Sequence, residues 1–180
     1  MRISFSLFSP IFFAALLLIP ATHAGAQTPP IPVGQHSSTP EDIKAINQVV
    51  ENFRLAIVNK DVKLLTSQLL NSTILFSSAV PPQQIRNIRE KFDVHFDGIF
   101  TDGLSDFGKF LASEKGNVEE LFHDVKIVQD GNMAWVNFDY EFQMEHKTQN
   151  YGIESWQLIK DVNDQWKIIS VVWSVHLPAK

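Results

Sequence analysis

The sharpest local group of residues that could do chemistry is the run Asp93-Val94-His95-Phe96-Asp97. On a strand, Asp93, His95 and Asp97 would point the same way, and two carboxylates with an imidazole can bind a divalent metal. Ligands along one strand, however, lie about 7 Å apart. We therefore favour a solvated strand face with Val94 and Phe96 inward, and we predict no metal site.

A second candidate is the carboxylate pair Asp139 and Glu141, which alternates along a predicted strand with aromatic residues. If this face looked into a cavity, one carboxyl could have a raised pKa and act as a base. The opposite face carries Phe138, Tyr140 and Phe142 and is the better candidate for the core. The sequence therefore favours a solvated or interface-facing pair.

Aromatic side chains on the predicted strands could wall a cavity with a few polar tips, which is what a small ligand needs. We name four candidate ligand-binding residues: Tyr140, Phe142, Trp156 and Trp173. Plain core packing is the alternative for each of them. His123 and His176 stand alone, which favours a structural or exposed position over a catalytic one.

The motifs of several enzyme classes are missing from the sequence. It contains no Gly-rich phosphate loop, no G-x-S-x-G elbow and no H-E-x-x-H motif. These absences disfavour a P-loop, a serine nucleophile and a zincin-type zinc site, and we predict no cofactor.

The N-terminal residues have the layout of a secretory signal peptide. Arg2 is the only charged residue before Glu41, an apolar run follows from Ile11 to Ile19, and Ala24-Gly25-Ala26 is an A-x-A cleavage site. The apolar run is too short to span a bilayer. We predict a signal peptide over residues 1–26, a periplasmic or secreted location, and no membrane attachment after cleavage.

Charge and cysteine content narrow the class of protein further. Removing Arg2 leaves 14 basic residues against 20 acidic ones, so the formal net charge changes from -5 to -6. Nucleic-acid binding needs a basic surface and is disfavoured. The chain has no cysteine, which excludes disulfides and favours a bacterial periplasm over a eukaryotic secretory pathway.

The rest of the chain separates into a linker and one domain. Prolines with Gly, Ser and Gln predict a Pro-rich disordered linker over residues 27–40. Hydrophobic periodicity and capping residues predict helices over 40–59, 62–70, 83–92 and 105–114, and strands over 73–78, 94–100, 118–129, 133–145, 152–160 and 165–176. Helices first and strands after indicate an α+β fold with helices on one face of an antiparallel sheet.

The order of these elements is similar to that of the nuclear transport factor 2-like superfamily, including its SnoaL-like domains. The matching residues are Phe53-Arg54-Leu55-Ala56 in the first helix, Lys60-Asp61, Leu64-Leu65, Phe76, and the ending Trp166-Lys167-Ile168-Ile169 with Trp173-Ser174. The resemblance covers residues 41–178. It implies a cystatin-like cone, in which a curved antiparallel sheet wraps the N-terminal helices around a cavity and the outer sheet face often makes a homodimer.

The last predicted strand is apolar on both faces, which is typical of a strand buried on both sides. Ile169, Val171, Trp173 and Val175 would lie on one face, and Trp166, Ile168 and Val172 on the other. Given the resemblance, we expect one face to line the core and cavity and the other to form a partner surface. The alternative is that Trp166 and Ile168 only cover loops at a sheet edge.

The resemblance leaves the activity open. The family's ketosteroid isomerase branch needs a carboxylate base near the position of Ser77, and Phe76, Ser77 and Ser78 carry none. We therefore favour an exported protein that binds a small apolar molecule and is not an enzyme. Two alternatives stay open: an isomerase-, cyclase- or dehydratase-type acid–base enzyme acting on a hydrophobic substrate, and a dimeric interaction module without a ligand.

Overall fold

The computed structural model describes residues 33–99 and 103–179. The predicted signal peptide and residues 27–32 of the predicted linker lie outside the described residues, and the signal peptide stays a prediction. Among the helices described, none is long and apolar enough to cross a membrane. The part of the chain considered below begins at Gln35.

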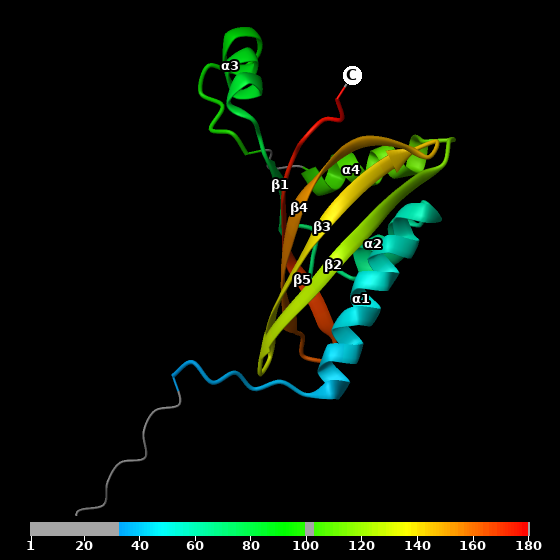
Figure 1. Cartoon of the computed structure of the whole chain (residues 1–180), viewed down its shortest axis with the longest axis vertical. Helices are drawn as coiled ribbons and strands as arrows, with labels where there is room; N and C mark the ends of the chain where they lie inside the picture. Colours follow the sequence, from blue (N-terminus) through cyan, green and yellow to red (C-terminus); the bar gives the residue numbers. More distant parts are fainter. Residues whose placement is uncertain (1–32, 100–102, 180) are drawn as a thin grey trace, which may run out of the picture. The chain divides into compact units, whose positions relative to one another are not determined.

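Apart from the strand predicted over 94–100, the elements of this part follow in the predicted order (Figure 1). The helices are α1 (Pro40–Val58), α2 (Val62–Ser67), α3 (Pro82–Lys91) and α4 (Gly103–Ser113). The strands are β1 (Leu75–Ala79), β2 (Val118–Asp130), β3 (Met133–Met144), β4 (Lys147–Lys160) and β5 (Trp166–Ser174). Helix α3 buries none of its residues and stands away from the sheet in Figure 1.

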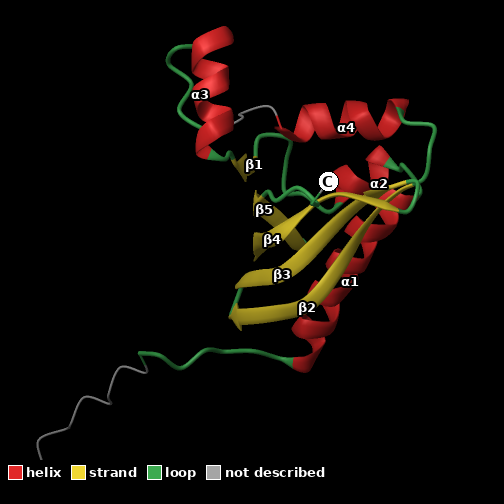
Figure 2. Ribbon diagram, turned by 45° about the horizontal axis from the view of Figure 1, so that its top comes forward, coloured by secondary structure: helices red, strands yellow, loops and turns green. Residues whose placement is uncertain are grey.

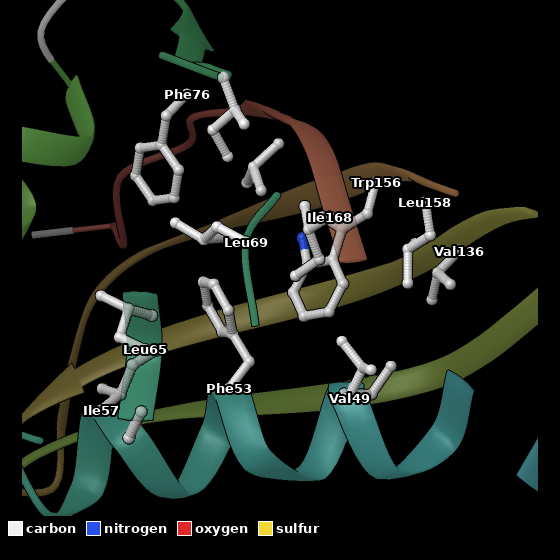
Figure 3. Close-up of a cluster of buried hydrophobic side chains, with 14 of the residues drawn as sticks. Val49, Phe53, Ile57, Leu65, Leu69, Phe76, Val136, Trp156, Leu158 and Ile168 are labelled. Atoms are coloured by element: carbon white, nitrogen blue, oxygen red, sulfur yellow. The ribbon is translucent and has the colours of Figure 1, made fainter. Parts of the chain in front are cut away.

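Helix α1 begins where the sequence predicts and packs its apolar stripe on the sheet. Thr39 is the N-cap: its hydroxyl accepts a hydrogen bond from the Asp42 backbone N–H at 3.1 Å, and Pro40 occupies the first turn. The buried stripe includes Val49, Phe53 and Ile57. In Figure 3, Val49 and Phe53 face side chains from the strands, and Ile57 lies beside Leu65 of α2. Helical spacing therefore supplies one complete wall of the core.

The five strands form one curved sheet in the order β1-β5-β4-β3-β2. Strands β2 to β5 pair antiparallel, and β1 runs parallel to β5. Register shifts interrupt all three antiparallel pairings, and one of them, between His123 and Lys126, contains Asp124 at a φ of 52°. Because bulges bend strands and increase their twist, the sheet curls around α1 (Figure 2). The predicted α+β cone is confirmed.

The predicted division of β5 into two faces is wrong. Ser170 pairs with Gln157 and Ile168 pairs with Leu158, so Ile169 is an extra residue on β5. The extra residue changes the alternation, and Trp166, Ile168 and Val171 are all buried in the one core. Trp166 and Ile168 therefore belong neither to an outer partner surface nor to a loop cover.

The strand predicted over 94–100 does not form in its described part, residues 94–99. Asp93 instead accepts a hydrogen bond from the His95 backbone N–H at 2.9 Å, and Asp97 accepts one from the Ile99 N–H at 2.9 Å. These are local turns of the kind that aspartate side chains stabilise. The described residues contain no group of three or more His, Asp or Glu side chains that could hold a metal ion.

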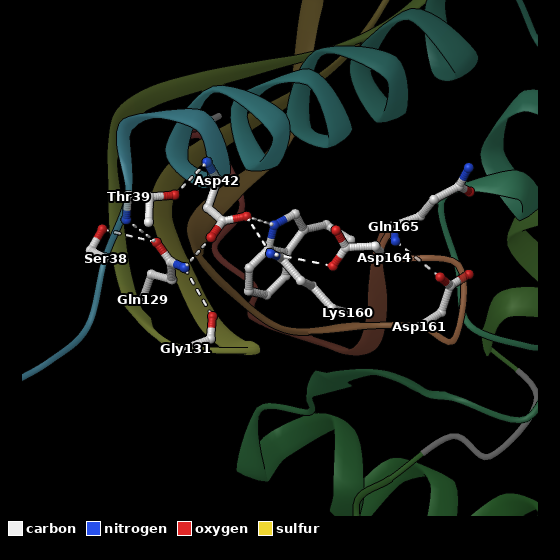
Figure 4. Close-up of polar contacts among 10 residues, drawn as sticks. Ser38, Thr39, Asp42, Gln129, Gly131, Lys160, Asp161, Asp164 and Gln165 are labelled. Carbon is white, nitrogen blue, oxygen red and sulfur yellow. Dashed lines mark hydrogen bonds and ion pairs between the residues drawn. The ribbon is translucent and has the colours of Figure 1, made fainter.

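A polar network fixes the start of α1 to one end of the sheet, where β2 and β4 end and β5 begins (Figure 4). The Asp42 carboxylate contacts the Lys160 ammonium at 2.7 Å and accepts hydrogen bonds from Trp166 Nε1 at 3.1 Å and Gln129 Nε2 at 2.8 Å. The hydrogen bond with Lys160 is the largest cause of a pKa well below the usual range for Asp42. The Thr39 backbone N–H also donates to Gln129, so the end of the predicted linker is held by the domain.

Candidate functional site

A cavity of about 380 Å³ lies between the helices and the inner face of the sheet. This volume is within the range of about 300–1,000 Å³ that is typical of small-molecule sites. Aromatic rings and one methionine make most of its wall, from α1, β1, α4, β3 and β5: Phe53, Phe76, Phe107, Phe110, Tyr140, Phe142, Met144 and Trp173. The remaining lining residues are polar: Glu120, Gln149, Asn150 and Glu154.

Strand register places both glutamates on the inner face of the sheet. Glu120 on β2 pairs with Phe142, and Glu154 on β4 pairs with Phe138 and with Trp173. All three partners are aromatic and belong to the buried or cavity-lining set. The two carboxyl groups therefore project into an apolar space from two different strands.

The two glutamates are among the most buried polar residues of the domain. Glu120 is 7% exposed and Glu154 is 4% exposed. The Trp156 indole N–H donates to Glu154 Oε1 at 2.5 Å. Within the described residues, no hydrogen-bond donor contacts the Glu120 carboxyl, although that side chain lines the cavity.

Burial is the largest cause that raises both pKa values, because removing a carboxylate from water disfavours its charged form. The pKa of Glu120 rises well above its ordinary value, and repulsion by Glu154 adds to the effect of burial. The pKa of Glu154 rises to about 7, with the Trp156 hydrogen bond opposing the effect of burial. Near neutral pH the pair therefore holds a proton that ordinary glutamates would have lost.

Tyr140 presents a neutral phenol between β4 and β5. Its hydroxyl oxygen lies 2.9 Å from Asn150 Oδ1 and 2.8 Å from the Ser174 carbonyl oxygen. Burial first, and then the two glutamates, raise the pKa of Tyr140 above its ordinary value. Gly152 makes this contact geometry feasible, because a Cβ there would lie 2.4 Å from the Ser174 carbonyl oxygen.

Helix α4 closes one side of the cavity with two phenylalanines. Phe107 stacks on Phe76 with 5.6 Å between ring centroids, and Phe110 lies 6.0 Å from the Phe142 ring. A neighbouring hollow of about 320 Å³ shares Phe76, Phe107, Phe110 and Trp173 with the cavity. The two spaces therefore share part of their walls.

Three of the four predicted ligand-binding residues, Tyr140, Phe142 and Trp173, line the cavity. Trp156 does not, since it is fully buried with its ring 4.6 Å from that of Phe53 and 5.1 Å from that of Phe138. Trp156 therefore packs in the core, which was the alternative given for each of these aromatic residues. Ligand binding by the other three stays a prediction.

The other candidate residues lie on the outer face of the sheet, around a hollow of about 640 Å³ that is lined in part by His123, Asp139, Glu141 and His176. Asp139 is exposed, and Glu141 accepts hydrogen bonds from Thr148 and Gln143. Those two hydrogen bonds lower the pKa of Glu141, with Thr148 the larger cause. Glu141 is thus not a carboxyl with a raised pKa, and the predicted homodimer through this face stays a prediction.

The sequence contains a signal for the buried glutamates, which the candidate residues chosen from the sequence did not include. Glu120 alternates with Val118 and Phe122, and Glu154 alternates with Trp156 and Leu158, all of them on the apolar phase of their strands. A carboxylate in the apolar phase predicts either a bulge or a buried acid. Here it is a buried acid.

The comparisons with known proteins support the fold and leave the activity undetermined. No family model matches the sequence, and no curated protein matches it. A Nostoc punctiforme protein of unknown function with a cystatin-like fold covers 78% of this chain and 96% of its own, at 15% identity and a TM-score of 0.55.

Two further solved structures show the same similarity. A putative dehydratase from the NTF2-like family of Streptomyces avermitilis covers 78% of this chain and 100% of its own, at 15% identity and a TM-score of 0.57. An NTF2-like protein of unknown function from Pseudomonas putida covers 80% and 99%, at 11% identity and a TM-score of 0.60. The chain has the nuclear transport factor 2-like, or cystatin-like, fold. A fold shared at such identities does not determine a function.

Proposed function

We propose that this chain is an exported binding protein that holds a small, largely apolar molecule in the cavity between α1, α4 and the sheet. The observation that carries the proposal is the cavity itself, about 380 Å³ with eight apolar or aromatic residues in its wall. Apolar surface of a ligand would leave water there, while the few polar groups would fix its orientation. The N-terminal signal-peptide pattern supports export.

A thermal-shift screen of the chain from Gln27 against small apolar compounds tests this proposal. A true ligand at 100 times its Kd should stabilise the protein by about 2.7 kcal/mol. Trp173 is the only tryptophan in the cavity wall, so Trp173→Phe should remove most of the ligand-induced change in tryptophan fluorescence and keep a thermal shift.

Trp135→Phe is the matched control, because Trp135 pairs with Val128 and Gln157 and alternates with the buried Ala134 and Val136. That variant should keep the fluorescence response. No thermal shift across the panel would contradict the proposal for those compounds. A shift whose fluorescence response survives Trp173→Phe would place the ligand elsewhere.

The buried glutamates favour a second candidate function, acid–base catalysis on a hydrophobic substrate. Glu154, with a pKa of about 7, is suited to accept a proton near neutral pH, and a protonated Glu120 beside it could donate one. The pair lies on β2 and β4, away from the β1 position near Ser77 that the isomerase branch requires.

Proton abstraction next to a carbonyl can be detected without knowing the natural substrate. In D₂O, ketones found by the screen should lose their α-hydrogen NMR signals faster with the protein than without it. Glu154→Gln should abolish the difference, and Glu119→Gln, whose side chain bonds to the exposed His146, should not. Binding without any exchange would leave the non-catalytic function.

A further inference from the structure

The charge in the cavity wall is of one sign. Among the described residues that line it, Glu120 and Glu154 are the only charged ones, and no described Lys, Arg or His in the wall balances them. Tyr140 is the only other titratable residue in the part of the wall that the structure describes. A buried carboxylate is costly unless a cation or several hydrogen bonds compensate it.

The lack of a compensating group is clearest at the Glu120 carboxyl. It is 93% buried by residue, it lines the cavity, and within the described part of the chain no donor contacts it. Among the residues that the structure describes, Glu154 has a single donor, the Trp156 indole. The pair therefore has acceptor capacity directed into a space that only a ligand or water can fill.

The rest of the wall suits a cation as well. Rings of Phe76, Phe107, Tyr140 and Trp173 surround the space, and an aromatic face attracts an ammonium within about 6 Å of its centroid. An apolar amine would meet rings along its body and carboxylates at its charged end. A neutral compound of the same shape would leave both carboxyl groups uncompensated.

We propose that the cavity selects hydrophobic molecules that carry one ammonium group, with Glu120 and Glu154 as the residues that recognise the cation. This inference rests on the proposed binding function and names its ligand class. The bound cation would also favour the ionised form of the pair, because an opposite charge at close range stabilises a carboxylate.

Three probes that share one apolar body test the proposal: phenylbutylamine, phenylbutanol and phenylbutanoic acid, measured by calorimetry with the wild-type chain at pH 7. The amine should bind at least about tenfold more tightly than the alcohol, a difference of about 1.4 kcal/mol, and the acid should bind most weakly. In buffers of different ionisation enthalpy, amine binding should release up to about one proton and alcohol binding none.

Glu120→Gln and Glu154→Gln should each remove most of the preference for the amine over the alcohol. Glu119→Gln removes the same charge from the neighbouring position of β2. The Glu119 side chain lies outside the cavity and contacts His146 at 3.2 Å. This matched control should keep the full preference. The probe comparison needs only wild-type protein, so it decides even if a variant fails to fold.

Equal affinity for amine and alcohol would overturn the ammonium inference while leaving the binding function in place. Tight binding of the acid at pH 7 would overturn it too. If none of the three probes binds, the inference also fails, and the apolar screen described above then decides the binding function separately.

Discussion

Replacing Glu154 with glutamine should make the protein about 3 kcal/mol more stable than wild type at pH 8, with a difference that shrinks toward zero at pH 4. The pKa of Glu154 rises from an ordinary value of 4.5 to about 7 in the folded chain. A raised pKa means that the folded state holds the proton more tightly. The proton on Glu154 therefore stabilises the folded state fully below pH 4.5, and this stabilisation is lost as the pH rises through about 7.

The size of this effect follows from the shift. One pKa unit corresponds to about 1.4 kcal/mol, so a rise from 4.5 to about 7 corresponds to about 3 kcal/mol at pH 8. Glutamine resembles the protonated acid in shape and stays neutral at every pH. The variant should therefore lack this part of the pH dependence.

Urea unfolding of both proteins at pH values from 4 to 9 measures the difference directly, provided that the m-values agree. Glu119→Gln should follow the wild-type curve within about 0.5 kcal/mol, as is usual for a substitution outside the core. Parallel curves for wild type and Glu154→Gln would show that burial does not hold a proton on Glu154.

Glu154→Gln should also change the pKa of the neighbouring Glu120. Repulsion by Glu154 is one cause of the raised pKa of Glu120, so removing that charge should lower the pKa of Glu120. Effects of the two glutamine substitutions should then not add, as expected for interacting groups. The double variant would gain less stability at pH 8 than the sum of the single ones.

Features of the fold and the site that depend on residues close together in the sequence could be predicted, and features that depend on pairing between distant segments could not. Helix α1 was predictable because its capping residue Thr39 and its stripe, including Phe53, are local. The alternation of β3 likewise indicated that the face with Tyr140 and Phe142 would point inward. Such patterns depend on residues two to four positions apart.

The faces of β5 were not predictable in the same way. The extra residue at Ile169 depends on how β5 pairs with Gln157 and Leu158 of another strand. A single bulge changes which residues are inward for the rest of the strand. The residues of 94–99 show the converse, because alternation alone does not form a strand when side chains such as Asp93 and Asp97 bond to the local backbone.

The buried carboxylates lie between these cases. The apolar phase of Glu120 and Glu154 is visible in the sequence, but their burial requires Phe107 and Phe110 of α4 to close the space above them. That contact joins segments whose relative position no local pattern fixes. The sequence could therefore identify two unusual glutamates, while the cavity that makes them a site required the tertiary structure.

Replacing Trp156 with alanine should cost about 3–5 kcal/mol of folding free energy, the range found for deletion of a large aromatic side chain from a core. Trp156 is fully buried, and its ring lies among those of Phe53, Phe122 and Phe138 (Figure 3 shows the first of these). Trp135→Ala on the other face of the sheet should cost less, because Trp135 is only partly buried.

Trp156→Phe separates the packing of this residue from its hydrogen bond. Phenylalanine keeps an aromatic ring among Phe53 and Phe138 but has no N–H for Glu154, whose carboxyl that donor reaches at 2.5 Å. Because this bond lowers the pKa of Glu154 against the effect of burial, the pKa should rise above about 7 in the variant. Carboxyl ¹³C chemical shifts across a pH titration measure it. An unchanged pKa would mean that the indole only packs, and that burial alone sets the proton affinity on which the proposed acid–base function depends.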